Sequence, residues 1–309
     1  MNSKVVVIGS CNMDLSMYAP RLPKPGETIH GNKFVLGFGG KGANQCVAAA
    51  KLGAATCMLS KLGNDSFGKD FLAKLQEAGV NTDHVSFSNT SHTGMAQITV
   101  SDDGENQIVI AAGANEELSP SDVDAARGVV QAAAVVVCQL ETPVETTVHA
   151  LRLRQHCKGV TIVNAAPALA NPDPRLLSLC DIFCVNEAEA GVMVGGEVTA
   201  ENAHSAVLRL LDGGCGTAVI TLGARGAVLA SRADRRVVHV SAPRVTAVDT
   251  TGAGDMFVGA LAYYLAYHPG LSLEETTRRA CELAALSVLR PGTQSSFPAR
   301  RDLSDRLFS

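Results

Sequence analysis

Val248-Asp249-Thr250-Thr251-Gly252-Ala253-Gly254-Asp255 places three small residues between two carboxylates, and an apolar run, Met256 to Ala262, follows at once. Upstream, Val237 to Val240 is typical of a strand, which Pro243 ends. The order predicts a strand, a tight glycine turn and the start of a helix. The first N–H groups of a helix lack intrahelical partners and carry partial positive charge. The turn is therefore a candidate anion site.

The residue types in this turn suit phosphoryl transfer. Glycines let the backbone approach an anion without a Cβ in the way. Asp255, at a reference pKa of about 3.9, is ionised at neutral pH. It can act as a general base that deprotonates a hydroxyl while the N–H groups hold the phosphoryl group. An ordinary glycine loop with an Asp near a helix dipole explains the stretch equally well, so its sequence alone leaves both readings open.

Composition limits the classes of partner. The chain has 309 residues, 46% of them hydrophobic and 18% charged, with net charge −4 and no Trp. We expect neither a nucleic-acid partner nor a membrane partner, because there is no broad basic field, no stacking platform and no window approaching 18 apolar residues. Nine cysteines without a Cys-x-x-Cys pair predict free thiols in a reducing compartment. The cytoplasm is the default location.

Short apolar runs without alternation indicate strands buried on both faces, hence a mainly parallel, doubly wound sheet covered by helices. We expect one α/β domain over residues 1–309. The strand runs are Lys4–Gly9, Val135–Leu140, Val160–Val163, Ile182–Val185 and Ala218–Leu222, and the helical patterns are Ala43–Leu52, Phe67–Ala78, Ala200–Leu211 and Leu273–Leu289.

Two segments differ from the rest and predict a small β-sheet lid, inserted from roughly residues 15–37 and 93–112. The second shows partial alternation around Asp103-Gly104, a hairpin signal. A β-layer near the carboxyl edge of the main sheet would exclude water from a phosphoryl-transfer site. Two ordinary edge hairpins are the alternative.

Gly37-Phe38-Gly39-Gly40-Lys41-Gly42 matches G-x-G-x-x-G, but a dinucleotide fingerprint would follow the first strand directly, and here some thirty residues intervene. No Walker A sequence occurs either. A glycine turn into a helix that carries Lys41 and Asn44 instead suits a polyol. Further polar side chains follow predicted strands and offer donors and acceptors for hydroxyl groups, although each by itself fits a surface or capping role: Asn12, Asp14 and Glu141.

At these residues the chain resembles the ribokinase (PfkB-type) carbohydrate kinases. Asp249–Asp255 is similar to the second signature of that family, and Gly39–Gln45 to the first. The resemblance runs from about Val5 to Pro298. Shorter matches add order and spacing: Gly9–Asp14, Pro25–Thr28, Gly113–Asn115, Gln139–Glu141, Asn186–Glu189, and Thr221–Gly223 with Gly226.

The resemblance implies ATP-dependent phosphorylation of D-ribose at O5. Asp255 would be the base and the backbone of Gly252, Ala253 and Gly254 the anion hole. Alternatives are a kinase of the same family acting on adenosine, fructose or another pentose, and a sugar-binding regulator without activity. By resemblance the sugar contacts are Asn12, Asp14, Gly40, Lys41, Asn44, Glu141 and Asp255, and the ATP contacts are Asn186, Thr221, Gly223, Gly226, Gly254 and Cys281.

The open edges of the predicted lid favour pairing with a second copy, so we expect a homodimer through the lid. The resemblance also implies two cations. Mg²⁺ would be served indirectly by Glu187 and Glu189, whose alternative role is charge at a helix start. The implied K⁺ ligands are the side chains of Asp249 and Ser296 with the carbonyls of Thr251, Ser287, Arg290 and Gly292. The alternative for Asp249 is that it only caps the turn.

Three positions depart from the family pattern. Ala165 stands where the family has Pro, and Met256 follows the base where Ser or Thr is common. Cys281 stands near the expected adenine, where the family often has Asn or His. A thiol is a weak hydrogen-bond partner, so this position bears on nucleotide affinity.

Overall fold

The computed structural model describes residues 4–309 and contains two sheets. The main sheet has nine strands in the order β13-β12-β11-β10-β9-β8-β1-β4-β5. Neighbours pair in parallel from β5 to β11, and β12 and β13 are antiparallel. The predicted doubly wound, mainly parallel architecture is confirmed. Its strands are β1 Val5–Ile8, β4 Thr56–Gly63, β5 Asn81–Ser88, β8 Val135–Cys138, β9 Val160–Asn164, β10 Ile182–Asn186, β11 Thr217–Thr221, β12 Ala227–Ser231 and β13 Val237–Val240.

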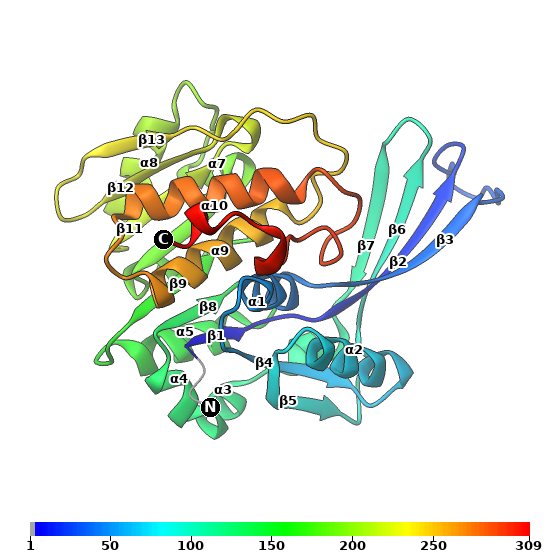
Figure 1. Ribbon diagram of the computed structural model, residues 1–309. Coiled ribbons are helices and arrows are strands. Elements are labelled where there is room, and N and C mark those ends of the chain that lie inside the picture. Colours follow the sequence, from blue (N-terminus) through cyan, green and yellow to red (C-terminus); the bar gives the residue numbers. More distant parts are fainter. Residues whose placement is uncertain (1–3) are drawn as a thin grey trace.

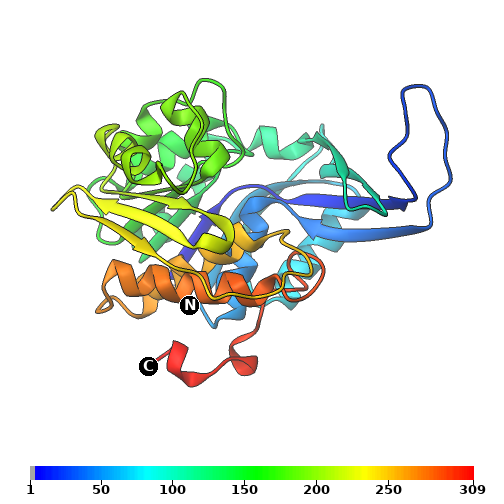
Figure 2. The same ribbon diagram turned by 90° about the horizontal axis from the view of Figure 1, so that it is seen from above.

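Helices cover both faces of this sheet, as Figure 2 shows. Strand β1 illustrates why: Val5 and Val7 enter one hydrophobic core, and Val6 and Ile8 enter another. One face carries α1 Lys41–Lys51, α2 Ser66–Glu77, α9 Ala253–Tyr267 and α10 Leu273–Ser287. The other carries α3 Pro120–Ala125, α4 Arg127–Ala132, α5 Val144–Arg154, α6 Arg175–Ser178, α7 Glu187–Val194 and α8 Ala203–Asp212.

A four-stranded sheet stands off the main body, at the right of Figure 1. Its order is β3-β2-β6-β7, with β2 parallel to β6 and antiparallel pairs at either side. The predicted hairpin is present, with Gly104 at φ +87° in its turn. The two predicted lid segments therefore pair with one another, the first over slightly wider bounds and the second over slightly narrower ones. The strands are β2 Asn12–Ala19, β3 Lys33–Gly39, β6 Gly94–Ser101 and β7 Asn106–Ala111.

The expected strands and helices agree with the structure to within a few residues, but the sequence pattern missed β4, β5 and β12 and the helices α3 to α6. Strand β4 contains Ser60 and Lys61, which interrupt its apolar run. Ser60 is nevertheless buried, because its hydroxyl pairs with the Cys11 thiol at 3.1 Å. Short 3₁₀ turns complete the chain: η1 Gly113–Glu117, η2 Gly223–Arg225, η3 Arg300–Asp302 and η4 Asp305–Leu307.

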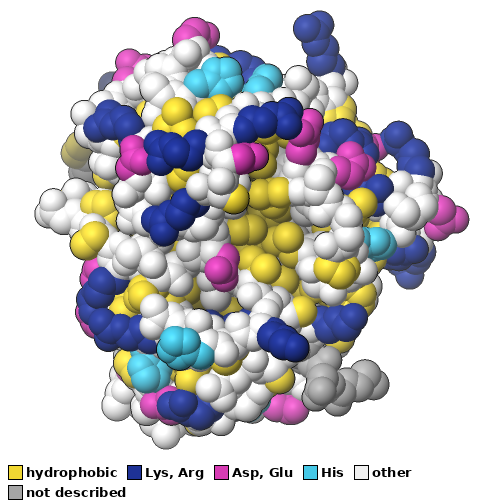
Figure 3. Space-filling model, turned by 90° about the vertical axis from the view of Figure 1, so that its left-hand side faces the viewer, with side chains coloured by type: hydrophobic (Ala, Val, Ile, Leu, Met, Phe, Trp, Pro, Cys, Tyr) yellow, Lys and Arg dark blue, Asp and Glu magenta, His cyan; other side chains and the backbone are white. Residues whose placement is uncertain are grey.

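The face opposite the small sheet has an apolar centre, around which basic, acidic and histidine side chains are interspersed (Figure 3). None of the helices within residues 4–309 has both the length and the apolarity that crossing a bilayer requires. All nine cysteines are free, and all but Cys157 are buried.

Candidate active site

Helix α9 begins at a turn that only glycine can form. Gly252 caps the helix at φ +78°, and a Cβ there would lie 2.5 Å from Thr293 Cγ2. The N–H of Ala253 donates to the Thr250 carbonyl at 3.2 Å, and that of Met256 to the Gly252 carbonyl at 2.8 Å. Within residues 4–309, the N–H groups of Gly252 and Gly254 have no protein acceptor. The turn thus keeps donors for an anion at the positive end of α9.

Asp255 lies in the first turn of α9 and is 8% exposed. Its Oδ1 accepts a hydrogen bond from Gln45 Nε2 and its Oδ2 one from Asn44 Nδ2, both at 2.9 Å. Burial raises the pKa of this carboxyl above its usual value, against the opposing effects of the Lys41 ammonium and the two amide donors. A carboxylate held in place with a raised pKa is suited to accept a proton.

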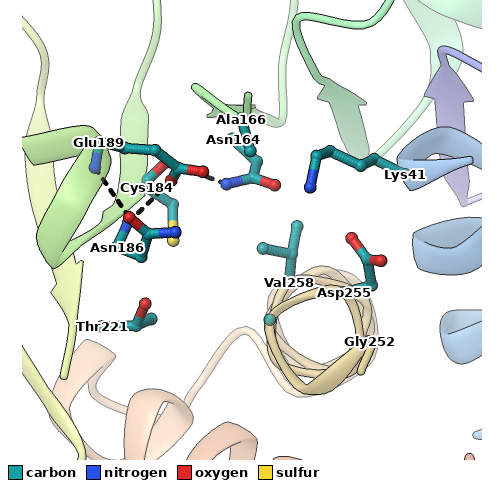
Figure 4. A pocket seen from close by; sticks show the side chains of 11 residues that line it. Lys41, Asn164, Ala166, Cys184, Asn186, Glu189, Thr221, Gly252, Asp255 and Val258 are labelled. Atoms are coloured by element: carbon teal, nitrogen blue, oxygen red, sulfur yellow. Dashed lines mark hydrogen bonds between the residues drawn. The ribbon is translucent and has the colours of Figure 1, made fainter. Parts of the chain in front are cut away.

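A pocket opens beside this carboxylate, between α9, α1 and the ends of β9, β10 and β11 (Figure 4). The ammonium group of Lys41 and the carboxylate of Asp255 face the same space. The pocket brings together residues predicted for the base, the anion hole, the sugar and the nucleotide. Its walls are formed by Lys41, Asn164, Ala166, Cys184, Asn186, Glu189, Thr221, Gly252, Gly254, Asp255 and Val258.

Other predicted sugar ligands lie directly behind Lys41 rather than in the pocket wall. Gly40 has φ +85°, and a Cβ there would lie 2.7 Å from the backbone nitrogen of Asn12. Glu141 Oε2 accepts hydrogen bonds from the Lys41 N–H at 2.9 Å and the Ser10 hydroxyl at 2.5 Å. Three segments that are far apart in sequence therefore meet at the start of α1.

The carboxyl group of Asp14 is close enough to those of Glu141 and Asp255 for their charges to act on it. Burial, together with the charges of Glu141 and Asp255, raises its pKa to about 6. A Cβ on Gly39 would lie 2.3 Å from Asp14 Oδ2, so the facing strand leaves room for this carboxyl. Neighbouring carboxylates need hydrogen-bond donors, and the hydroxyl groups of a polyol supply them.

On the far side of the pocket, Asn186 and Glu189 cap helix α7. Asn186 Oδ1 accepts from the Glu189 N–H at 2.8 Å, and Glu189 Oε2 from the Asn186 N–H at 2.9 Å. Burial raises the pKa of Glu189. Glu187 pairs with Arg225 at 2.5 Å. The capping role left open by the sequence is therefore present, and both cap residues also line the pocket.

Three residues predicted for the nucleotide lie outside the pocket wall. Gly223 has φ +55° and open space, with no heavy atom within 4 Å of where a Cβ would stand, whereas a Cβ on Gly226 would lie 1.9 Å from the Val240 carbonyl oxygen. Cys281 is buried in α10, which raises the pKa of its thiol to about 12. Cys184 is the thiol that lines the pocket.

The segments predicted to hold K⁺ lie side by side. The N–H groups of Val248 and Asp249 donate to the Val288 carbonyl at 2.8 and 3.2 Å. Asp249 accepts the N–H of Thr251 at 2.9 Å and that of Gly292 at 2.8 Å, so it does cap the turn. The Ser296 hydroxyl donates to the Thr293 carbonyl at 2.9 Å. Carboxylate, hydroxyl and carbonyl oxygens, the types predicted here, are those that hard cations bind.

Of the residues that hold the base, the sequence identified Asn44, as a sugar contact, but assigned no role to Gln45 or Gln294. Gln45 is fully buried; its Nε2 also donates to Asn164 Oδ1 at 2.9 Å, and its Oε1 accepts from Gln139 Nε2 at 2.8 Å. Gln294 donates to Asn44 Oδ1 at 3.0 Å. Gln45 stands within the first signature motif, which was the available signal. Nothing in the sequence singles out Gln294.

Comparison with known proteins agrees with this geometry. The model of the pfkB family carbohydrate kinases matches residues 2–300. A protein of Mus musculus named ribokinase is 48% identical over 305 residues, covering 98% of this chain and 94% of its own. A deoxyribokinase of Salmonella typhi is 39% identical, covering 98% of both chains. The solved structure of Arabidopsis thaliana ribokinase complexed with ribose and ATP has a TM-score of 0.88 at 32% identity, covering 98% of this chain and 97% of that one.

Proposed function

Because the chain belongs to the pfkB family of carbohydrate kinases, we propose that it transfers the γ-phosphoryl group of ATP to O5 of D-ribose. One observation carries the proposal. The buried Asp255 stands beside the open N–H groups of Gly252 and Gly254, in the same pocket as Lys41. A hydroxyl, a base and an anion site can meet there.

In the proposed reaction, Asp255 takes the proton of the sugar hydroxyl as that oxygen bonds to the γ-phosphorus, and the bond to the β-phosphate oxygen breaks. ADP leaves with the electron pair. The N–H groups of Gly252 and Gly254 would form the anion hole. The N–H of Ala253, which the sequence assigned to the same hole, instead donates to the Thr250 carbonyl at 3.2 Å. Lys41 faces the same space and adds a positive charge. Positioning and charge stabilisation supply most of the rate in such transfers.

Ribose as the acceptor is supported by the polar residues around Lys41 and by the names of the relatives. The hydroxyl groups of the sugar would be held by Asn12, Asp14, Gly40, Asn44 and Glu141. Each of these contacts would discriminate against an analogue that lacks the corresponding hydroxyl. The similarity to a deoxyribokinase adds 2-deoxyribose to adenosine, fructose and other pentoses as alternative acceptors.

The nucleotide would lie along the pocket wall formed by Asn186, Thr221 and Gly254, toward Gly223, Gly226 and Cys281. In the described part of the chain no group of three or more His, Cys, Asp or Glu is placed to hold a metal. This fits Mg²⁺, which takes few carboxylates and completes its shell with waters and phosphates. Glu189 and Glu187 would orient those waters, and Mg²⁺ would neutralise phosphate charge.

A K⁺ ion would be coordinated by the side chains of Asp249 and Ser296 and by the carbonyl oxygens of Thr251, Ser287, Arg290 and Gly292. The proximity of these segments supports the assignment. Held there, the ion would stabilise the turn that precedes the anion hole without touching substrate.

The small sheet would act as a lid and pair with a second copy. Strand β7 is exposed along its whole length, and Val109 is 70% exposed. Such an edge is a template for pairing. Sedimentation should show a dimer, and Val109→Lys should shift it toward monomer. Nine free thiols support a reducing location, for which we propose the cytoplasm.

A coupled assay of ADP release across sugars tests the function. We expect the highest kcat/KM with ribose and a lower rate when Na⁺ or Li⁺ replaces K⁺ at constant ionic strength. Equal turnover of ribose and of other sugars would remove the substrate assignment, and equal rates in all three cations would remove the K⁺ site.

A further inference from the structure

A buried chain of amide hydrogen bonds connects the C-terminal loop 291–297 to the carboxylate of Asp255. Gln294 Nε2 donates to Asn44 Oδ1 at 3.0 Å, and Asn44 Nδ2 donates to Asp255 Oδ2 at 2.9 Å. Gln294 is 8% exposed and Asn44 5%. One end of an amide donates and the other accepts, so a donor at position 294 determines which end of Asn44 faces Asp255.

The same loop packs against the glycine turn. Gly292 donates its N–H to Asp249 Oδ2 at 2.8 Å. A Cβ on Gly252 would lie 2.5 Å from Thr293 Cγ2 and 3.2 Å from the Phe297 ring, so both side chains abut the turn. The loop therefore contacts the support of the base and the support of the anion site together.

Lys51 fixes the loop to the helix that carries Asn44. Its Nζ donates to the carbonyls of Gln294 at 2.6 Å and Phe297 at 3.0 Å. Asn44 and Lys51 lie near opposite ends of α1. The helix thus holds the loop at two points, one through the backbone of Gln294 and one through its side chain.

We infer that Gln294 is a positioning residue, held by Lys51, that fixes the orientation of the Asn44 amide and so keeps a hydrogen-bond donor on Asp255. The inference rests on the proposed phosphotransfer. Gln294 acts only through Asn44. Gln294 itself is not among the proposed sugar contacts, so its loss would act on the base through Asn44.

The substitution Gln294→Glu separates this role from simple packing, because it keeps the shape and reverses the polarity. A carboxylate at this position needs donors, so the Asn44 amide turns its Nδ2 toward it and presents Oδ1 to Asp255. A carbonyl oxygen facing a carboxylate disfavours the ionised form and raises the pKa of the base. Gln294→Met removes the donor with little change in volume.

The test is kcat and KM as functions of pH for the wild type and both variants, with Gln155→Glu as the matched control on an exposed residue at the end of α5. Gln294→Glu should move the acid limb of kcat upward by about one pH unit or more, and so lower kcat about tenfold at a pH below both limbs. Gln294→Met and Lys51→Met should lower kcat several-fold with KM nearly unchanged. The control should match the wild type.

A double-mutant cycle between Asn44 and Gln294 provides a second readout, which does not require the Gln294→Glu variant to fold. In a cycle of Asn44→Ala with Gln294→Met, the double variant should lose little more than Asn44→Ala alone, because the two residues act in one chain. Additive losses, or folded Gln294 variants with the wild-type acid limb and kcat, would overturn the inference. A wild type without sugar-dependent ADP release would instead overturn the proposed function.

Discussion

The carboxylate of Glu141 caps helix α1 by accepting the backbone N–H of Lys41 at 2.9 Å. The same oxygen accepts the hydroxyl of Ser10, which is fully buried. Glu141, predicted as a sugar ligand with a surface or capping role as the alternative, thus does cap the helix that carries Lys41 and Asn44. The Glu141 side chain therefore has a structural role as the cap of α1 and a proposed role in ribose binding, and two substitutions can separate these roles.

Glu141→Gln should keep α1 in place while weakening ribose binding, because an amide oxygen still accepts the Lys41 N–H but carries no charge. Glu141→Ala should also lower the free energy of unfolding by about 1–3 kcal/mol, because two donors lose their acceptor. Urea unfolding and KM for ribose measure the two effects. Equal stability of the Ala and Gln variants would show that the cap contributes nothing.

The raised pKa of Asp14, about 6, predicts that KM for ribose rises as the pH falls below that value. Only the ionised form of Asp14 accepts hydrogen bonds from sugar hydroxyls through both oxygens, and the protonated form predominates below the pKa. Steady-state kinetics between about pH 5 and pH 8 should show the rise, and Asp14→Asn should abolish it while raising KM throughout. A KM constant over this range in the wild type would contradict the role of Asp14.

Gly226→Ala should destabilise the fold, because its Cβ would lie 1.9 Å from the Val240 carbonyl oxygen at φ +95°. The backbone conformation alone costs about 1–3 kcal/mol. Gly223→Ala is the matched control: φ is +55°, and no atom lies within 4 Å of its Cβ position. Thermal unfolding should rank Gly226→Ala well below Gly223→Ala. The reverse ranking would show that β13 yields to the added methyl group.

Local sequence was sufficient for much of the fold. The apolar runs gave strands such as β1 and β8 because parallel strands buried on both faces carry no polar residues. The small sheet followed from alternation around Asp103-Gly104. Strand β4 was missed because its polar Ser60 is satisfied by Cys11, a residue between β1 and β2 that is distant in sequence and that no local pattern of β4 encodes.

Some residues of the candidate site could also be located from the sequence, whereas others were identified only in the folded chain. The two signature motifs located Lys41, Gly252 and Asp255, which do line one pocket. The partners of Asp255 lie 210 and 211 residues away in sequence, so their convergence is a property of the folded chain. The roles of these residues toward ribose, ATP and cations stay predictions. The amide chain through Gln294 became visible only in three dimensions.

Asp255 is proposed as the base for phosphoryl transfer to ribose, and ADP release by the variant Asp255→Asn in the presence of ribose measures that role. The variant keeps the side-chain shape but cannot accept the proton. We expect a folded protein whose kcat falls by at least 10²–10⁴, roughly 3–5 kcal/mol of transition-state stabilisation. A folded Asp255→Asn variant that turns over ribose at close to the wild-type rate would contradict it.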